Sequence, residues 1–188
     1  METRMQIPTG NLTLLSDRAS QYSTGQLHIH HCLRDDSPLI HQTLKNPDLA
    51  LSDPACQIIK NDNTTTVGLI CRDGYKIAIK RYNTKNAWHR LRRTVRSSRA
   101  ENCWHFTQTL QSLDISVAPA VAWIQEIQVG LKGRSWFVSE FVDGISCLDH
   151  FKGDVPPAEI KKTLGEIVEI LCKLRHKHIS HGDLKATN

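Results

Sequence analysis

The chain has 188 residues, a formal net charge of +5 and 39% apolar residues. This length fits one domain, or one and a fraction, and the apolar content supports a hydrophobic core, which excludes wholesale disorder. No apolar run reaches the roughly 18 residues of a membrane-spanning helix, and the N-terminus lacks the pattern of a secretory signal. Six scattered cysteines without a C-x-x-C pair favour reduced thiols over a disulfide framework or a zinc site.

Residues 1–50 are the least informative part, and we predict an N-terminal extension of uncertain structure. The stretch QLHIHHCL (26–33) alternates in the manner of a short strand. Its His28, His30 and His31 suggest a metal site, but no carboxylate or cysteine stands at ligand spacing on a recognisable helix. We therefore interpret them as solvated histidines.

From Cys56 onward the sequence becomes regular and predicts strands. The apolar run CQIIK is followed by the polar loop NDNTTT and a second apolar run at 67–71, and Asp-Gly at 73–74 signals a turn. Residues 75–82 then alternate between the two faces of a strand. One face carries Tyr75, Ile77 and Ile79, and the other carries Lys76, Ala78 and Lys80. The pattern is typical of a hairpin in a twisted antiparallel sheet.

A helix is predicted over about residues 86–113. The apolar residues of one helical face recur at steps of three and four: Cys103, Phe106, Leu110 and Leu113. A second strand pair follows at 121–127 and 135–141, and a glycine-bearing turn at 128–134 joins the two strands.

The last predicted helix is the clearest one. Asp154 is a suitable N-cap, and Pro156 and Pro157 are tolerated in a first helical turn. Its apolar stripe consists of Ile160, Leu164, Ile167, Leu171 and Leu174. The predicted order is therefore strands, helix, strands, hinge, helix and loop, which is an α+β arrangement.

The chain ends in HGDLKATN (181–188), which resembles the kinase catalytic-loop pattern H-x-D-L-x-x-x-N with glycine in place of the usual arginine. In that pattern Asp183 would take the proton of an acceptor hydroxyl, and Asn188 would hold a magnesium ion on the phosphates. Lys185 would reach the transferring phosphoryl group and offset its charge. The alternative is a chance polar loop, but four fixed positions behind an amphipathic helix argue against it.

The stretch IAIK (77–80) is similar to the kinase strand motif V-A-I-K and falls on a predicted strand, as that motif requires. Alternation puts Ala78 and Lys80 on one face. The small side chain would let adenine approach the sheet, and the ammonium would meet the α- and β-phosphates of ATP. An exposed lysine on a strand is common, but this one stands about one hundred residues before the catalytic loop, as in kinases.

The stretch SEFVDG (139–144) ends an apolar strand and resembles the hinge of kinases. There the backbone groups of Glu140 and Val142 would hydrogen-bond the adenine edge, so their side chains carry little information. An ordinary strand end is the alternative.

The loop ahead of Lys80 departs from the kinase pattern, because no G-x-G-x-x-G is present. The corresponding loop is KNDNTTTV (60–67). Its backbone N–H groups and the hydroxyls of threonines such as Thr65 and Thr66 would meet phosphate, although less closely than glycine allows.

The helix glutamate that should pair with the lysine is a second departure. Between residues 81 and 119 the only acids are Glu101 and Asp114, so Glu101 is the candidate by residue type. It lies two residues before Cys103, roughly 200° around the helix from the predicted apolar face, so its phase is awkward.

Taken together, these residues resemble the lipopolysaccharide core kinase family, the bacterial Kdo and heptose kinases with a protein-kinase-like fold. The resemblance covers roughly residues 60–188 and rests on KIAIKRYNTKNAWHRLRR, SRAENCW, WFVSEFVDG and HGDLKATN. It implies an N-lobe over residues 51–142, with an antiparallel sheet and one main helix. It also implies that residues 143–188 begin a helical C-lobe with the hinge, the long helix and the catalytic loop.

The resemblance implies transfer of the ATP γ-phosphate, with magnesium, to a sugar hydroxyl of the lipopolysaccharide inner core at the cytoplasmic face of the inner membrane. In this family a further metal-binding Asp and the rest of the C-lobe follow the catalytic loop. We therefore expect the chain to be a fragment or a truncated product, with little or no phosphotransfer activity as an isolated 188-residue polypeptide.

The basic stretch 80–99, which contains no acid, suits an anionic partner such as a sugar-lipid acceptor or the membrane surface. A solvated helix face is the alternative. Nucleic acid is not expected, because aromatic residues for base stacking are not interleaved beyond Trp88. The oligomeric state stays open.

Two rival interpretations remain. One is another branch of the same fold, either an atypical Ser/Thr protein kinase or a small-molecule phosphotransferase of the aminoglycoside and choline kinase type. Lys185 speaks against the second of these, which typically have histidine there. The other rival is a non-catalytic pseudokinase that binds a nucleotide or a lipid surface.

Overall fold

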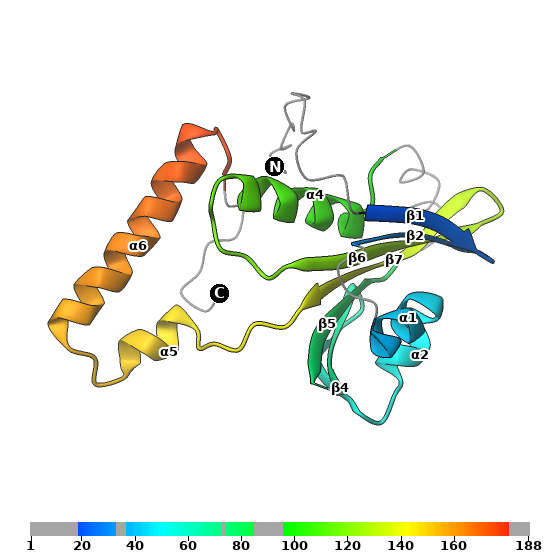
Figure 1. Cartoon of the computed structure of the whole chain (residues 1–188), viewed down its shortest axis with the longest axis horizontal. Helices are drawn as coiled ribbons and strands as arrows, with labels where there is room; N and C mark the ends of the chain where they lie inside the picture. Colours follow the sequence, from blue (N-terminus) through cyan, green and yellow to red (C-terminus); the bar gives the residue numbers. More distant parts are fainter. Residues whose placement is uncertain (1–18, 33–36, 73, 85–95, 181–188) are drawn as a thin grey trace. The chain divides into compact units, whose positions relative to one another are not determined.

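The computed structural model describes residues 19–32, 37–72, 74–84 and 96–180, and these form an α+β fold (Figure 1). Contacts along the chain divide it into two compact units, one spanning Thr13–Val142 and the other including Asp143–Asn188. The first unit contains the sheet and the helices that cover it.

Within the described residues, seven strands form one antiparallel sheet. The strands are Ala19–Thr24 (β1), Leu27–Cys32 (β2), Cys56–Asn61 (β3), Thr65–Arg72 (β4), Tyr75–Tyr82 (β5), Ala120–Gln128 (β6) and Leu131–Glu140 (β7). Their spatial order is β1-β2-β6-β7-β5-β4-β3. Strand β7 therefore pairs with β5 as well as with β6, its neighbour in sequence.

The turn between β6 and β7 is shorter than the predicted turn at 128–134. It consists of Val129 and Gly130, whose φ angles of 50° and 74° suit a two-residue type I′ hairpin. The predicted turn was too long because Gly133 was assigned to the loop. Gly133 lies inside β7, where an added Cβ would overlap the Glu126 carboxylate, so the glycine serves a close approach rather than a turn.

The two faces of the sheet differ, and we name them by the residues of β5. The back face carries Ile77 and Ile79, which are 1% and 0% exposed, and the front face carries Ala78 and Lys80. The predicted alternation of residues 75–82 is thus confirmed. Helices α1 (Pro38–Lys45) and α2 (Pro47–Leu51) cover the back face, opposite helix α4 on the front face (Figure 1).

Helices α1 and α2 lie largely in the stretch 1–50, where the sequence analysis predicted no helix, whereas the strand-like alternation noted there is confirmed by β2. Each begins with a side-chain cap followed by proline. Ser37 Oγ accepts from the Ile40 N–H at 3.2 Å, and Asn46 Oδ1 accepts from the Leu49 N–H at 3.0 Å. The pairs Ser-Pro and Asn-Pro are the sequence signal that predicts these helix starts.

Asp48 of α2 ties this helix to the sheet. Its carboxylate accepts hydrogen bonds from Arg81 Nη1 at 3.1 Å, from Arg134 Nη1 at 2.5 Å and from Trp136 Nε1 at 3.1 Å. Arg134 also donates to both carboxylate oxygens of Glu126. Charge-assisted bonds of this kind are the stronger class of hydrogen bond, so residues far apart in sequence hold the back face together.

Helix α4 (Arg99–Ser112) packs on the front face and starts later than predicted. Residues 96–98 are not helical, and residues 86–95 lie outside the described part. Ser98 and Glu101 form a capping box, in which Ser98 Oγ accepts from the Glu101 N–H and Glu101 Oε2 accepts from the Ser98 N–H, both at 3.1 Å. The Ser-x-x-Glu spacing is the signal that marks this start.

The predicted apolar face of this helix was also wrong in phase. The buried positions are Ala100, Trp104 and Thr107, whereas Cys103 and Phe106 are half-buried. A small residue and a threonine occupy two of the buried positions, so hydropathy alone does not reveal the face.

The second unit contains α5 (Cys147–Lys152) and α6 (Pro157–His176). Asp154 does not cap α6, contrary to the prediction. The N-cap position is Pro156, because Pro157 is already the first helical residue. The proline side chain has no polar atom, so it makes no cap hydrogen bond.

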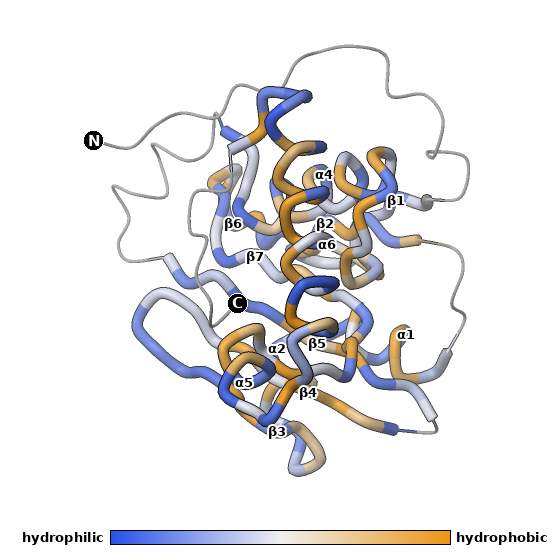
Figure 2. Tube along the Cα trace, turned by 90° about the vertical axis from the view of Figure 1, so that its left-hand side faces the viewer, coloured by the Kyte–Doolittle hydropathy of each residue, from blue (hydrophilic) through white to orange (hydrophobic). Residues whose placement is uncertain are grey.

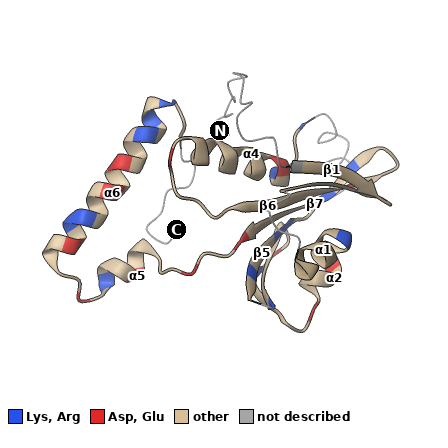
Figure 3. Ribbon diagram, in the orientation of Figure 1, with Lys and Arg blue, Asp and Glu red and all other residues tan. Residues whose placement is uncertain are grey.

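The predicted apolar stripe of α6 recurs along the helix (Figure 2), between acidic and basic residues (Figure 3). Leu174 is 7% exposed, whereas Leu164 and Leu171 are 49% and 37% exposed, so in the described structure part of the stripe stays uncovered. None of the described helices combines the length and the apolar character that crossing a membrane requires.

Candidate functional site

The front face of β5 presents the two residues of the IAIK motif that the sequence assigned to a nucleotide. Lys80 is exposed and Ala78 is half-buried. Among the described residues Lys80 forms no ion pair, and its ammonium lies 5.4 Å from the centre of the Tyr82 ring. An ammonium without a carboxylate partner is free to meet an anion such as a phosphate.

Strand β7 brings the hinge sequence directly beside this motif. Ala78 pairs with Ser139 and Lys80 pairs with Phe137 in the register of β5 and β7. Glu140 therefore ends β7 next to the strand that carries the lysine. The sequence did not predict this neighbour, because β6 stands between β5 and β7 in the chain order.

The backbone of Glu140 has an unusual hydrogen-bond pattern. Its N–H donates to the Pro119 carbonyl at 2.9 Å, while the next N–H, of Phe141, donates to the Lys76 carbonyl at 2.9 Å. Residue pairs of an antiparallel ladder normally exchange two such bonds, but Pro119 has no N–H to return. The Glu140 carbonyl thus lacks its ladder donor and can accept a bond from another group.

Val142 follows directly as the last residue of the first unit. Its side chain is 60% exposed. Whether its backbone contacts adenine stays a prediction.

The loop between β3 and β4 is held by a carboxylate rather than by glycine. Asp62 Oδ1 accepts from the Thr64 N–H, the Thr64 hydroxyl and the Thr65 N–H at 2.7–2.8 Å. The Thr64 hydroxyl, followed by the Thr64 N–H and Lys60, holds the pKa of Asp62 well below its usual range. Asp62 therefore stabilises the turn from within the loop. The N–H groups of Thr64 and Thr65 already donate to its carboxylate, so they are not available to a phosphate.

The structure separates the two threonines proposed to meet phosphate. Thr65 pairs with Tyr82 and so belongs to the front face, whereas Thr66 pairs with Arg81 on the back face. The Thr66 hydroxyl donates to Asn61 Oδ1 and accepts from Arg81 Nη2, both at 3.0 Å. Of the two, only Thr65 shares a face with Lys80.

Glu101 is engaged in the capping box of α4, and the described residues show no ion pair between it and Lys80. Another residue links the helix to the lysine strand. The Tyr82 hydroxyl lies 3.0 Å from Cys103 Sγ of α4, and the Arg99 guanidinium lies 6.0 Å from the Tyr82 ring centre. Tyr82 is the last residue of the KRY stretch (80–82), and no role was predicted for it from the sequence.

The three remaining predicted residues, Asp183, Lys185 and Asn188, lie outside the described residues. Their convergence with Lys80 stays a prediction.

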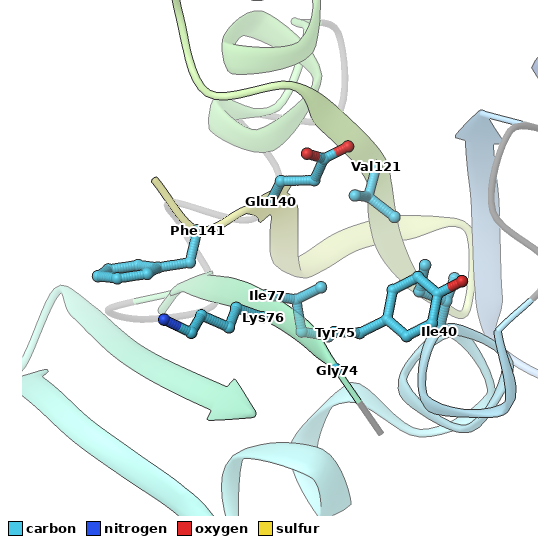
Figure 4. A pocket seen from close by; sticks show the side chains of 8 residues that line it. All are labelled: Ile40, Gly74, Tyr75, Lys76, Ile77, Val121, Glu140 and Phe141. Carbon is cyan, nitrogen blue, oxygen red and sulfur yellow. The ribbon is translucent and has the colours of Figure 1, made fainter. Parts of the chain in front are cut away.

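A cavity of about 320 Å³ opens beside the hinge (Figure 4). It is lined in part by Tyr75, Ile77 and Glu140, whose side chains share the back face, and by Ile40 of α1. Lys76 and Phe141 line it as well, so the cavity lies where β5 begins and β7 ends and is bordered by residues of both faces.

Comparisons with known proteins give little to set beside this geometry. No protein-family model matches the sequence, and no curated protein matches it. Among solved structures, the chain is similar to "WaaP in complex with acyl carrier protein", with 20% sequence identity and a TM-score of 0.46. The match covers 70% of this chain and 51% of that one, so the chain spans about half the length of this neighbour.

Proposed function

We propose that this chain contains the nucleotide-binding part and the catalytic loop of an ATP-dependent kinase of the lipopolysaccharide core kinase type. One observation carries the proposal. Strands β5 and β7 are neighbours, so Ala78, the Lys80 ammonium, which forms no ion pair with the described residues, and the Glu140 carbonyl lie on one strand pair.

These groups fit an adenine nucleotide. A small side chain at Ala78 leaves room for a flat ring over the sheet. The Glu140 carbonyl, deprived of a ladder donor by Pro119, suits the exocyclic amine of adenine. Lys80 lies two residues after Ala78 on the same face of β5, and its ammonium suits the phosphates. ATP supplies the phosphoryl group, and Asn188 is the proposed ligand of its magnesium ion.

The remaining roles rest on the motif HGDLKATN. Asp183 would accept the proton of the acceptor hydroxyl, and Lys185 would offset charge on the transferred group. The acceptor we propose, a Kdo or heptose hydroxyl of the lipopolysaccharide core at the cytoplasmic membrane face, rests on the sequence resemblance alone.

Nucleotide binding by the 188-residue chain tests the first part. Titration calorimetry should detect MgATP binding that Lys80→Ala weakens by at least tenfold, because the variant removes the ammonium beside the phosphates. Lys45→Ala, at the C-terminal end of α1, is the matched control and should leave the affinity unchanged. Equal affinities of wild type and Lys80→Ala would overturn this assignment.

Radiolabel transfer from ATP to a lipopolysaccharide core acceptor, a protein and an aminoglycoside tests the second part. Any transfer should favour the first acceptor and disappear in Asp183→Ala, while MgATP binding persists. Because little or no transfer is expected of the isolated 188-residue chain, the acceptor preference of any residual transfer, rather than its amount, separates the proposed activity from the rival functions.

A further inference from the structure

Tyr82 lies where the lysine strand, helix α4 and the front face meet. Its side chain points to the same face as that of Lys80, because the two residues are two positions apart on β5. The Lys80 ammonium lies 5.4 Å from the ring centre, within the range of a cation–π contact. The Tyr82 ring is therefore a contact of the Lys80 ammonium on the front face.

The other end of Tyr82 is fixed to the helix. Tyr82 is 7% exposed, and its hydroxyl lies 3.0 Å from Cys103 Sγ on α4. Burial first, and the neighbouring Cys103 second, raise the pKa of Tyr82, so the phenol stays protonated and can donate to the sulfur. A buried ring held at its hydroxyl has little freedom to move.

The glutamate that was expected to link α4 to Lys80 has another role. Glu101 accepts a hydrogen bond from the Ser98 N–H in the capping box. Moreover, Arg99 of the first turn of α4 lies over the Tyr82 ring at 6.0 Å. Arg99 and Cys103 of α4 thus both contact the lysine strand at Tyr82.

We infer that Tyr82 is a positioning residue, which aims the Lys80 ammonium at the nucleotide phosphates and ties that aim to helix α4. The inference rests on the proposed nucleotide site. Tyr82 itself does not contact the phosphates. Its ring keeps the lysine side chain over the front face, and its hydroxyl makes that arrangement depend on the position of the helix.

The test compares MgATP with adenosine, which lacks the phosphates, on the complete 188-residue chain. Tyr82→Leu should weaken MgATP binding by about fivefold, the equivalent of one exposed cation–π contact, and leave adenosine binding unchanged. In a Lys80→Met background the same substitution should change neither affinity, because the ammonium that Tyr82 positions is gone. Tyr82→Phe keeps the ring but removes the hydroxyl that contacts Cys103, so it should weaken MgATP binding by about twofold and leave adenosine binding unchanged.

Trp104→Phe is the control for general loosening of α4, because Trp104 packs on His30 and not on Lys80. Any loss of affinity in Trp104→Phe should be the same for MgATP and for adenosine. Equal losses of MgATP and adenosine in Tyr82→Leu, or the same loss in the Lys80→Met background, would show a merely structural role. If Tyr82→Leu fails to unfold cooperatively, Tyr82→Phe and Cys103→Ala decide, and an adenosine loss equal to the MgATP loss in both overturns the inference. Wild type that binds neither ligand would overturn the proposed function instead.

Discussion

The back and front faces of the sheet are built from the same strands but are closed to different degrees. On the back face, Ile77 and Ile79 lie under α1 and α2 and are almost fully buried. On the front face, α4 packs on β6, β7 and part of β5, while Ala78 is half-buried and Lys80 is exposed. The difference indicates that one face stabilises the unit and the other is available for binding.

The KRY stretch shows this division within three consecutive residues. Lys80 and Tyr82 belong to the front face, whereas Arg81 points to the back face and bonds to Asp48. The basic stretch 80–99 is therefore not one continuous surface, since its second cation is neutralised within the fold. Arg96 and Arg99 are exposed, and residues 85–95 lie outside the described part.

The largest expected effect comes from the back-face core. Ile79→Ala should lower the free energy of unfolding by about 3 kcal/mol, because it leaves a cavity in a fully buried site. Leu69→Ala, at a half-buried front-face position, should cost about 1 kcal/mol. Urea unfolding followed by tryptophan fluorescence measures both, and equal losses would contradict the contrast between the faces.

Asp48→Ala should cost about 2–3 kcal/mol, since it strips two arginines and the Trp136 N–H of a shared acceptor. Asp53, which pairs with the single arginine Arg72, provides the matched control. Asp53→Ala should be clearly less destabilising in the same urea assay. A loss in Asp48→Ala no greater than in the control would mean that the network does not hold α2 to the sheet.

Pro119→Ala should alter the hinge rather than the core. The new N–H at position 119 can donate to the Glu140 carbonyl and thereby compete with adenine. Adenosine affinity should fall by about fivefold, the value of one hydrogen bond, whereas inosine, which lacks the exocyclic amine, should be affected less. Pro54→Ala, in an exposed turn, controls for the loss of a proline. An unchanged preference for adenosine over inosine would refute the role of Pro119.

The smallest effect is a pH dependence at the covered part of the front face. His30 lies between Trp104 and Trp123, with ring-centre distances of 5.0 and 5.8 Å. Burial first, and then the nearby His105 and His31, lower the pKa of His30 below its ordinary value of 6.5. The unfolded chain therefore binds the proton more readily, so stability is full above pH 6.5 and falls as the pH drops toward the lowered pKa.

His30→Phe keeps an aromatic ring between the two tryptophans and removes the titration. Urea unfolding at pH 7.5 and 5.5 should show a smaller loss on acidification in this variant than in wild type. An identical loss would assign the pH dependence to the other histidines.

Local patterns predicted the local structure well. The alternation over 75–82 and the Asp-Gly turn signal before it located β5, and the hinge strand and long α6 also occur where expected. The sequence pattern did not predict the buried face of α4, because Ala100 and Thr107 are not conspicuously apolar. It also misplaced the turn at Gly133, because that glycine makes room for Glu126 of the neighbouring strand.

The sequence by itself determined which residues we propose for the chemistry of the candidate site, since the spacing of IAIK, the hinge and HGDLKATN is a property of the chain. Only the tertiary structure decided that β7 lies beside β5, that Arg81 faces Asp48 and that Tyr82 reaches Cys103. The physical reason is that strand order and helix docking depend on side-chain packing between distant residues. A repeat of two or of 3.6 residues along the chain carries no information about that packing.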